Sequence, residues 1–165
     1  QNADQGMAAG VEVELRKQLL PDLRLGANVS YMYTNVKLPE GGAYTNKDRS
    51  LQGASPILMN ADLTYSPRFG EDRQLNLSLL YNLQGKRIHA VGVSQLGDID
   101  QMPVHTLNFN ASYSFNRHFS AKVQVNDLLN RAIVFKQEVP KTGEYIEVER
   151  FKEGTSFEVG VSYNF

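Results

Sequence analysis

The sequence predicts an all-β protein, an antiparallel up-and-down β-barrel that crosses a membrane. Apolar residues recur at every second position over most of the chain, which is the period of a strand. Short turns alternate with long polar connections, and aromatic residues gather near the ends of the alternating runs. These three observations indicate a sheet with one apolar and one polar face, and 165 residues suit one such domain.

Seven runs carry the alternation, and no segment shows the period of a helix. In the second run Leu23 and Leu25 alternate with Arg24 and Gly26. Asp127 breaks the apolar phase after the sixth run, which predicts either a bulge or an exit from the membrane. The seven runs are 11–16, 23–34, 57–66, 75–84, 107–115, 119–125 and 157–165.

The connections alternate in length. Long loops on one side and short turns on the other are typical of outer-membrane barrels. The long loops continue in part as ribbon, because the segments KRIHAVGV and EYIEVERFK still alternate. The short turns lie near 20–22, 66–73 and 115–118, and the long outer loops near 37–55, 85–103 and 131–154.

The two faces differ in charge. The apolar face of the seven runs carries no charged residue, and the other face is mostly Asn, Ser, Gln, Thr and Gly. A soluble antiparallel sandwich also alternates, so this difference alone decides nothing. The charged residues of the polar face are Glu12, Glu14, Arg16, Arg24, Asp62, Lys122 and Glu158.

The aromatic residues distinguish the two architectures. A sandwich places large rings in mid-strand, where burial is deepest, whereas a bilayer selects rings at both interfaces. The sequence therefore predicts two aromatic girdles around an aliphatic belt. One girdle, beside the short turns and the C-terminus, comprises Tyr65, Tyr113, Phe115, Phe119, Tyr163 and Phe165. The outer girdle comprises Tyr31, Tyr33, Tyr81, Phe109 and Phe157.

An odd count of seven strands conflicts with the even number found in bacterial single-chain barrels. An open sheet in lipid would leave an unpaired edge. We therefore expect either an overlooked strand, in the first ten residues or in a long loop, or a C-terminal piece of a larger barrel. The opening QNADQG, without an initiator Met or a visible signal peptide, leads us to expect a trimmed, mature or fragmentary chain.

Composition excludes several other classes. The net charge of -1 provides no excess of basic residues for binding nucleic acid. The absence of cysteine excludes disulfides, and no apolar run reaches the length of a membrane helix. His89, His105 and His118 are scattered and favour neither a metal nor a catalytic site. Asp98 and Asp100 lack the flanking residues of a calcium loop. We expect no enzyme activity and no cofactor.

Two segments near the end of the chain resemble the C-terminus of a TonB-dependent outer-membrane receptor of the Bacteroidetes type. They are VQVNDLLNRAIVFKQE and GTSFEVGVSYNF, and MPVHTLNFNASYSF is similar to the strand before them. The residues that match the family signatures are Asn126, Leu128, Leu129, Asn130 and Arg131, with Asp127 inserted, followed by Gly154, Thr155, Phe157, Tyr163 and Phe165.

This resemblance implies seven strands of a 22-stranded barrel in the bacterial outer membrane, with extracellular long loops and a periplasmic C-terminus. It implies active import of a scarce ligand, such as a metal chelate, a vitamin or an oligosaccharide. The implied partners are membrane lipid, TonB, the barrel-assembly machinery that reads Tyr163 and Phe165, and the remaining N-terminal plug and strands. A surface lipoprotein is a further option. The sequence itself shows neither a plug domain nor a TonB box.

Two alternatives stay open: a small closed 8-stranded outer-membrane barrel acting as an adhesin or structural protein, and a soluble β-sandwich binding module. Within the transporter interpretation, the inward Arg24, Asp62, Lys122 and Glu158 are expected to contact a plug or water. Ligand specificity is expected in the long loops, with no single residue singled out. The loop residues that could contribute are Tyr44, Arg49, Tyr145 and Arg150.

Overall fold

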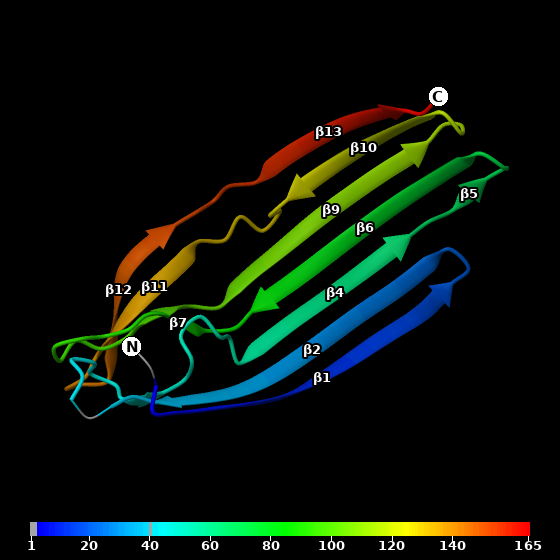
Figure 1. The fold of residues 1–165 in the computed structure, drawn as a ribbon. Helices are drawn as coiled ribbons and strands as arrows, with labels where there is room; N and C mark the ends of the chain where they lie inside the picture. Colours follow the sequence, from blue (N-terminus) through cyan, green and yellow to red (C-terminus); the bar gives the residue numbers. More distant parts are fainter. Residues whose placement is uncertain (1–2, 40) are drawn as a thin grey trace.

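Two antiparallel sheets make up the fold of the computed structural model, which describes residues 3–39 and 41–165 (Figure 1). The larger sheet contains β1 (Gln5–Leu20), β2 (Leu23–Lys37), β3 (Asp48–Arg49), β4 (Ile57–Tyr65), β5 (Arg68–Phe69), β6 (Arg73–Gln84), β9 (Val104–Ser114), β10 (Phe119–Asn126) and β13 (Ser156–Tyr163). The smaller sheet contains β7 (Arg87–Ala90), β8 (Ile99–Gln101), β11 (Ile133–Val139) and β12 (Glu144–Phe151).

The all-β antiparallel class is confirmed, but the predicted count of seven strands is wrong, because the described residues form 13. Seven strands follow one another across the larger sheet in the order β1-β2-β4-β6-β9-β10-β13. The other six lie in segments expected to be turns or long loops. Four of them, β3, β5, β8 and β11, escaped detection because they have only two to seven residues, whereas the segments of β7 and β12 were expected to continue as ribbon.

The larger sheet is a single open layer rather than a closed barrel. Its seven long strands lie side by side, with the short turns and the C-terminus at one end (Figure 1). The smaller sheet lies at the other end and does not cover a face of the larger one (Figure 1). β1 and β13 form the two edges, and among the described residues they do not pair with each other. The described residues therefore form no closed barrel by themselves.

The larger sheet keeps one continuous register, broken only by a shift between Gln18 and Leu20 at the end of β1. Directly paired residues of antiparallel strands point to the same face, so the pairing sorts side chains into rows. One such row runs Leu25, Leu63, Leu79 and Phe109, and the next residue on each strand belongs to the opposite face. The register thus produces the two predicted faces.

Few of the described residues are buried. Phe135, in the smaller sheet, is the one buried hydrophobic residue of the described part. The chain exposes 11062 Å² of surface, whereas a compact monomer of this mass exposes about 8,200 Å². Stable domains bury their apolar faces between two packed layers, and this sheet has a single layer. The larger sheet therefore lacks a core of its own.

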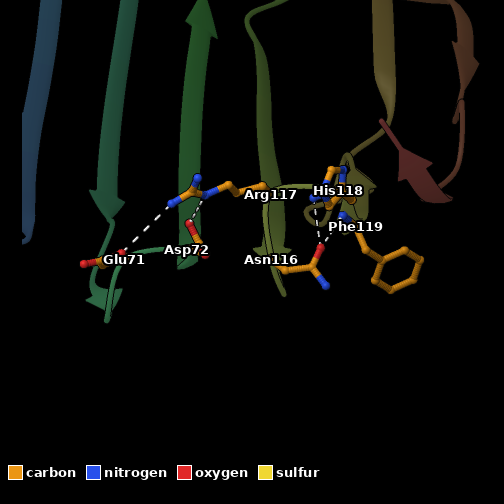
Figure 2. A network of polar contacts seen from close by, with 6 residues as sticks. All are labelled: Glu71, Asp72, Asn116, Arg117, His118 and Phe119. Carbon is orange, nitrogen blue, oxygen red and sulfur yellow. Dashed lines mark hydrogen bonds and ion pairs between the residues drawn. The ribbon is translucent and has the colours of Figure 1, made fainter. Parts of the chain in front are cut away.

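Polar contacts tie neighbouring short turns together (Figure 2). Arg117, in the turn between β9 and β10, donates to Asp72 at 2.6 Å and lies 4.0 Å from Glu71, both in the turn before β6. Within its own turn, the Asn116 side chain accepts hydrogen bonds from the backbone N–H groups of His118 and Phe119. Asp72 holds the pKa of Arg117 above its usual value through a hydrogen bond and its charge.

Gly26 makes room for a charged side chain on the polar face. A Cβ at Gly26 would lie 2.2 Å from the Asp62 carboxylate, which rests over the glycine from the neighbouring strand. We expect Gly26→Ala to lower the free energy of unfolding, and Asp62→Ala to remove most of that loss. A coupling of about 0.5–3 kcal/mol is typical of contacting residues.

A double-mutant cycle of urea unfolding measures this coupling. Gly6→Ala is the matched control, because a Cβ at Gly6 meets no atom within 4 Å. An equal cost of Gly26→Ala with and without Asp62 would contradict the steric explanation.

Candidate functional site

The apolar face of the larger sheet consists of cross-strand rows of mostly apolar residues, with Lys17 opposite Leu25 and His105 opposite Leu83. Apolar residues on this face are exposed or half-buried, with Leu79 at 40% and Val159 at 74%. Exposed apolar patches of this extent mark surfaces that contact another apolar phase or partner. The successive rows are Val13, Val29, Met59 and Leu83; Leu15, Ala27, Ala61, Tyr81 and Leu107; Leu25, Leu63, Leu79, Phe109, Val125 and Phe157; and Leu23, Tyr65, Leu77, Ala111, Val123 and Val159.

The aromatic residues predicted for the rim with the short turns lie at that end of the sheet. Rings of Tyr113 and Phe115 are 4.8 Å apart, and those of Phe115 and Phe119 are 5.1 Å apart. Tyr163 pairs with Phe119 across β13 and β10, and its ring lies 5.4 Å from that of Phe165. Tyr65, at the end of β4, instead pairs with Leu23 and Leu77.

The aromatic residues predicted for the outer rim lie on four strands and share the apolar face. Phe109 and Phe157 stand in one row, joined by Val125 of the intervening strand. Tyr81 lies one row farther from the short turns, and its hydroxyl is 2.6 Å from Nδ1 of His105. Tyr31 lies one row beyond that of His105, and Tyr33 one row farther still. The group therefore descends diagonally across the sheet from β2 to β13.

The opposite face of the sheet carries hydrogen-bonded polar side chains. The amides of Asn28, Asn60 and Asn82 form a ladder across β2, β4 and β6, with bonds of 2.8 and 2.6 Å. Two rows nearer the short turns, the hydroxyls of Thr64 and Ser78 are 3.2 Å apart. Because these side chains satisfy one another's hydrogen-bonding groups across strands, the face is ordered as well as polar.

The four inward charges predicted for this face lie on it. Lys122 donates to Glu158 at 2.8 Å, while Asp62 accepts a weak hydrogen bond from Thr64. Arg24 stands opposite Thr64 in the register. The structure thus brings two of the four charges together as an ion pair and holds the other two on neighbouring strands.

A cavity of about 230 Å³ lies at the loop end, where the smaller sheet meets the segments before β4. We call it the loop-side pocket; its polar lining includes Ser50, Lys86, Arg87, Asp98, Asp100, Glu138 and Tyr145. Of the predicted loop residues only Tyr145 lines it. The guanidinium of Arg49 lies 6.0 Å from the Tyr44 ring, and Arg150 binds Glu147 through two bonds of 2.7 Å.

Lys86 and Asp100 form the charged centre of the loop-side pocket. Lys86 donates to Asp100 at 2.9 Å and to the Tyr145 hydroxyl at 3.4 Å, and it lies 5.3 Å from the Tyr145 ring. Burial lowers the pKa of Lys86, but the hydrogen bond and charge of Asp100, together with Tyr145, outweigh this and leave the pKa raised. Sequence reasoning missed Lys86, because nothing local predicts a pairing between residues 14 apart.

The aspartates and histidines noted in the sequence have protein partners. Asp98 accepts from Asn46 and from the backbone N–H of Gly92, so its two oxygens are in use. The His89 ring packs edge-on against Phe135, and His118 Nδ1 lies 2.8 Å from the Asn164 carbonyl. Among the described residues no group of three or more His, Asp or Glu side chains is placed to hold a metal ion.

No helix in the described part of the chain is long and apolar enough to cross a membrane. Comparison of the chain with protein-family models, with curated proteins and with solved structures gave no match.

Removal of the Lys86 amine tests the centre of the loop-side pocket. We expect Lys86→Met to lower the free energy of unfolding at neutral pH by about 1–3 kcal/mol, because buried Asp100 loses its partner. We expect a loss at the lower end of this range, because solvent screens the half-exposed Lys86 side chain.

The pH dependence of this effect follows from the raised pKa. The pair stabilises the fold fully below the ordinary lysine pKa of 10.5 and loses this effect as the pH rises through the raised folded value. The difference between wild type and Lys86→Met, measured by chemical unfolding, therefore shrinks above pH 10.5. Lys141→Met, in the exposed turn after β11, is the control; equal costs for both variants would contradict the assignment.

Proposed function

We propose that the chain forms part of the wall of an outer-membrane β-barrel, in a TonB-dependent receptor that imports a scarce ligand. In this proposal the apolar face contacts lipid, the amide-rich face lines the lumen, and the smaller sheet extends outside the membrane. The resemblance of the C-terminal motifs supports the receptor class, and the geometry of the sheet supports the membrane wall.

The observation that carries the proposal is the diagonal course of both aromatic groups. From Tyr31 on β2 to Phe157 on β13 the outer group shifts by six residues over five strand-to-strand steps. From Tyr65 on β4 to Tyr163 the other group shifts by four residues over four steps, toward the same end. If each group marks one membrane interface, a shift of about one residue per strand corresponds to a strand tilt of about 35–40°. Barrel strands tilt by about 35–45° in the outer membrane.

The lack of a core also supports a wall. A single-layer sheet with an uncovered apolar face is unstable in water, where stable domains pack two layers together. A bilayer covers such a face without a second protein layer. The sandwich alternative requires two sheets packed face to face, whereas the smaller sheet here lies beyond the end of the larger one (Figure 1).

Strand direction indicates what completes the wall. All neighbours along the path of seven strands are antiparallel, so β1 and β13 run in the same direction. A closed antiparallel barrel therefore needs an odd number of further strands between these two edges. Identical copies joined edge to edge would create a parallel seam, so the proposal assigns closure to strands of other sequence. The 22-stranded receptor barrel satisfies this parity with 15 more strands, taking its count from the family resemblance.

A charge placed on either face of one strand tests the lipid contact. Leu79 and Leu80 are adjacent on β6 but belong to the apolar and the polar face, respectively. We expect Leu79→Lys to cost about 2–4 kcal/mol of stability in lipid vesicles, as for a lysine near the bilayer midplane. Leu80→Lys, which stands opposite Asp62, is the matched control and should cost much less. Equal costs, or stability of the native protein in water without detergent, would contradict the membrane wall.

The size of the native protein separates the receptor from the small barrel. One added strand would also satisfy the parity and would give the 8-stranded adhesin or structural barrel. We expect the protein isolated from its native membrane to be several times larger than the 18.5 kDa of this chain, because a receptor contains a plug and further strands. Mass spectrometry of the intact native species checks this. A species near 18.5 kDa would favour the small barrel and contradict the receptor.

A further inference from the structure

The smaller sheet repeats the strand order of the larger one. Its order β12-β11-β8-β7 follows the order β13-β10-β9-β6 of the strands to which these four are joined along the chain. Two residues separate β6 from β7, and two separate β8 from β9. The smaller sheet is thus a continuation of four wall strands beyond a break in the pairing.

On the side of β10 and β13 the break is longer, and a network of hydrogen bonds surrounds Asp127 there. The backbone N–H of Asp127 donates to the Asn108 side chain at 2.9 Å, and the Thr155 hydroxyl donates to the Asp127 carbonyl at 2.8 Å. The N–H of Asn130 donates to the Asp127 carboxylate at 3.2 Å. We call Asn108, Asp127, Asn130 and Thr155 the Asp127 joint. It connects β9, the turn after β10 and the segment before β13.

The backbone of the joint explains its residue types. Asp127 and Asn130 have φ values of 52° and 43°, in the left-handed region, where Asp and Asn are tolerated better than other residues with a side chain. Gly154, next to Thr155, has a φ of 87°. These positions lead the chain out of the pairing with β9 and allow it to return as β11, paired with β8.

The joint is one of two attachments of the hairpin of β11 and β12. The other is to the β8 segment, through three residue pairs and hydrogen bonds such as that from the Glu138 N–H to the Asp98 carbonyl. An unattached two-stranded hairpin is marginally stable in water. Glu138 and Tyr145, on this hairpin, face Lys86 and Asp100 across the loop-side pocket. The position of these two lining residues therefore depends on how firmly the hairpin is held.

We infer that the Asp127 joint is a rigid clamp that holds the β11–β12 hairpin, and with it the loop-side pocket, at a fixed position on the larger sheet. The inference does not depend on the membrane location or on the receptor class, because it concerns only the connection between the two sheets.

Hydrogen exchange of the full-length protein, followed by mass spectrometry, tests the clamp. Thr155→Val removes the hydroxyl that binds Asp127 with little change in shape, and Asn108→Ala removes the acceptor for its N–H. We expect each variant to accelerate exchange of the β11 and β12 amides about fivefold, the factor for one hydrogen bond of about 1 kcal/mol. Exchange in β4 and β6 should remain unchanged.

Thr64→Val is the matched control, because it also removes a hydrogen-bonded threonine hydroxyl, but in the larger sheet away from the joint. It should leave exchange of β11 and β12 unchanged. Acceleration confined to residues 127–131 would show a local turn without a clamp and would overturn the inference. Equal acceleration over the whole chain, or none in the hairpin, would also overturn it.

Discussion

The register of the larger sheet is the constraint on which the rest of the structure depends. Side chains of a strand alternate between faces, so a slip of one residue would move every apolar side chain to the polar side. Pairing from β1 to β13 keeps Leu, Val and aromatic residues in common rows and keeps the asparagine ladder on the other face. Both proposed contacts of the wall, with lipid and with the lumen, follow from this one register.

The sequence predicted the features that follow from strand period and missed those that depend on long-range pairing. Alternation located the seven strands of the main path and the face shared by aromatic residues such as Tyr81, Phe109 and Phe157, because period two is a local property. It did not predict the smaller sheet, although two of the alternating ribbon segments noted in the long loops became β7 and β12. A strand of three residues, such as β8, carries too few repeats to stand out.

The loop-side pocket shows the same limit at the level of single residues. Tyr145 was expected to contribute as an aromatic residue in a long loop, but its partner Lys86, and Asp100, which binds Lys86, come from two other segments. Asp100 is only 6% exposed, and a buried charge is costly unless it is paired. The bond from Lys86 supplies this pairing. A single sequence contains no local signal for such a pair, since neither partner has a distinctive neighbour along the chain.

The break between the two sheets is consistent with the proposed lipid contact of the larger one. In a bilayer every backbone polar group must be paired within the protein, so a wall strand tolerates no interruption among its lipid-facing rows. Gly85, Pro103 and Asp127 interrupt their strands at the end away from the short turns, the end nearer the outer aromatic group. Beyond this line the strands bend, shorten and pair through a bulge between Phe135 and Lys136. If the larger sheet lies in lipid as proposed, water can satisfy the backbone of the smaller sheet, which explains why the same four strands are regular in one sheet and irregular in the other.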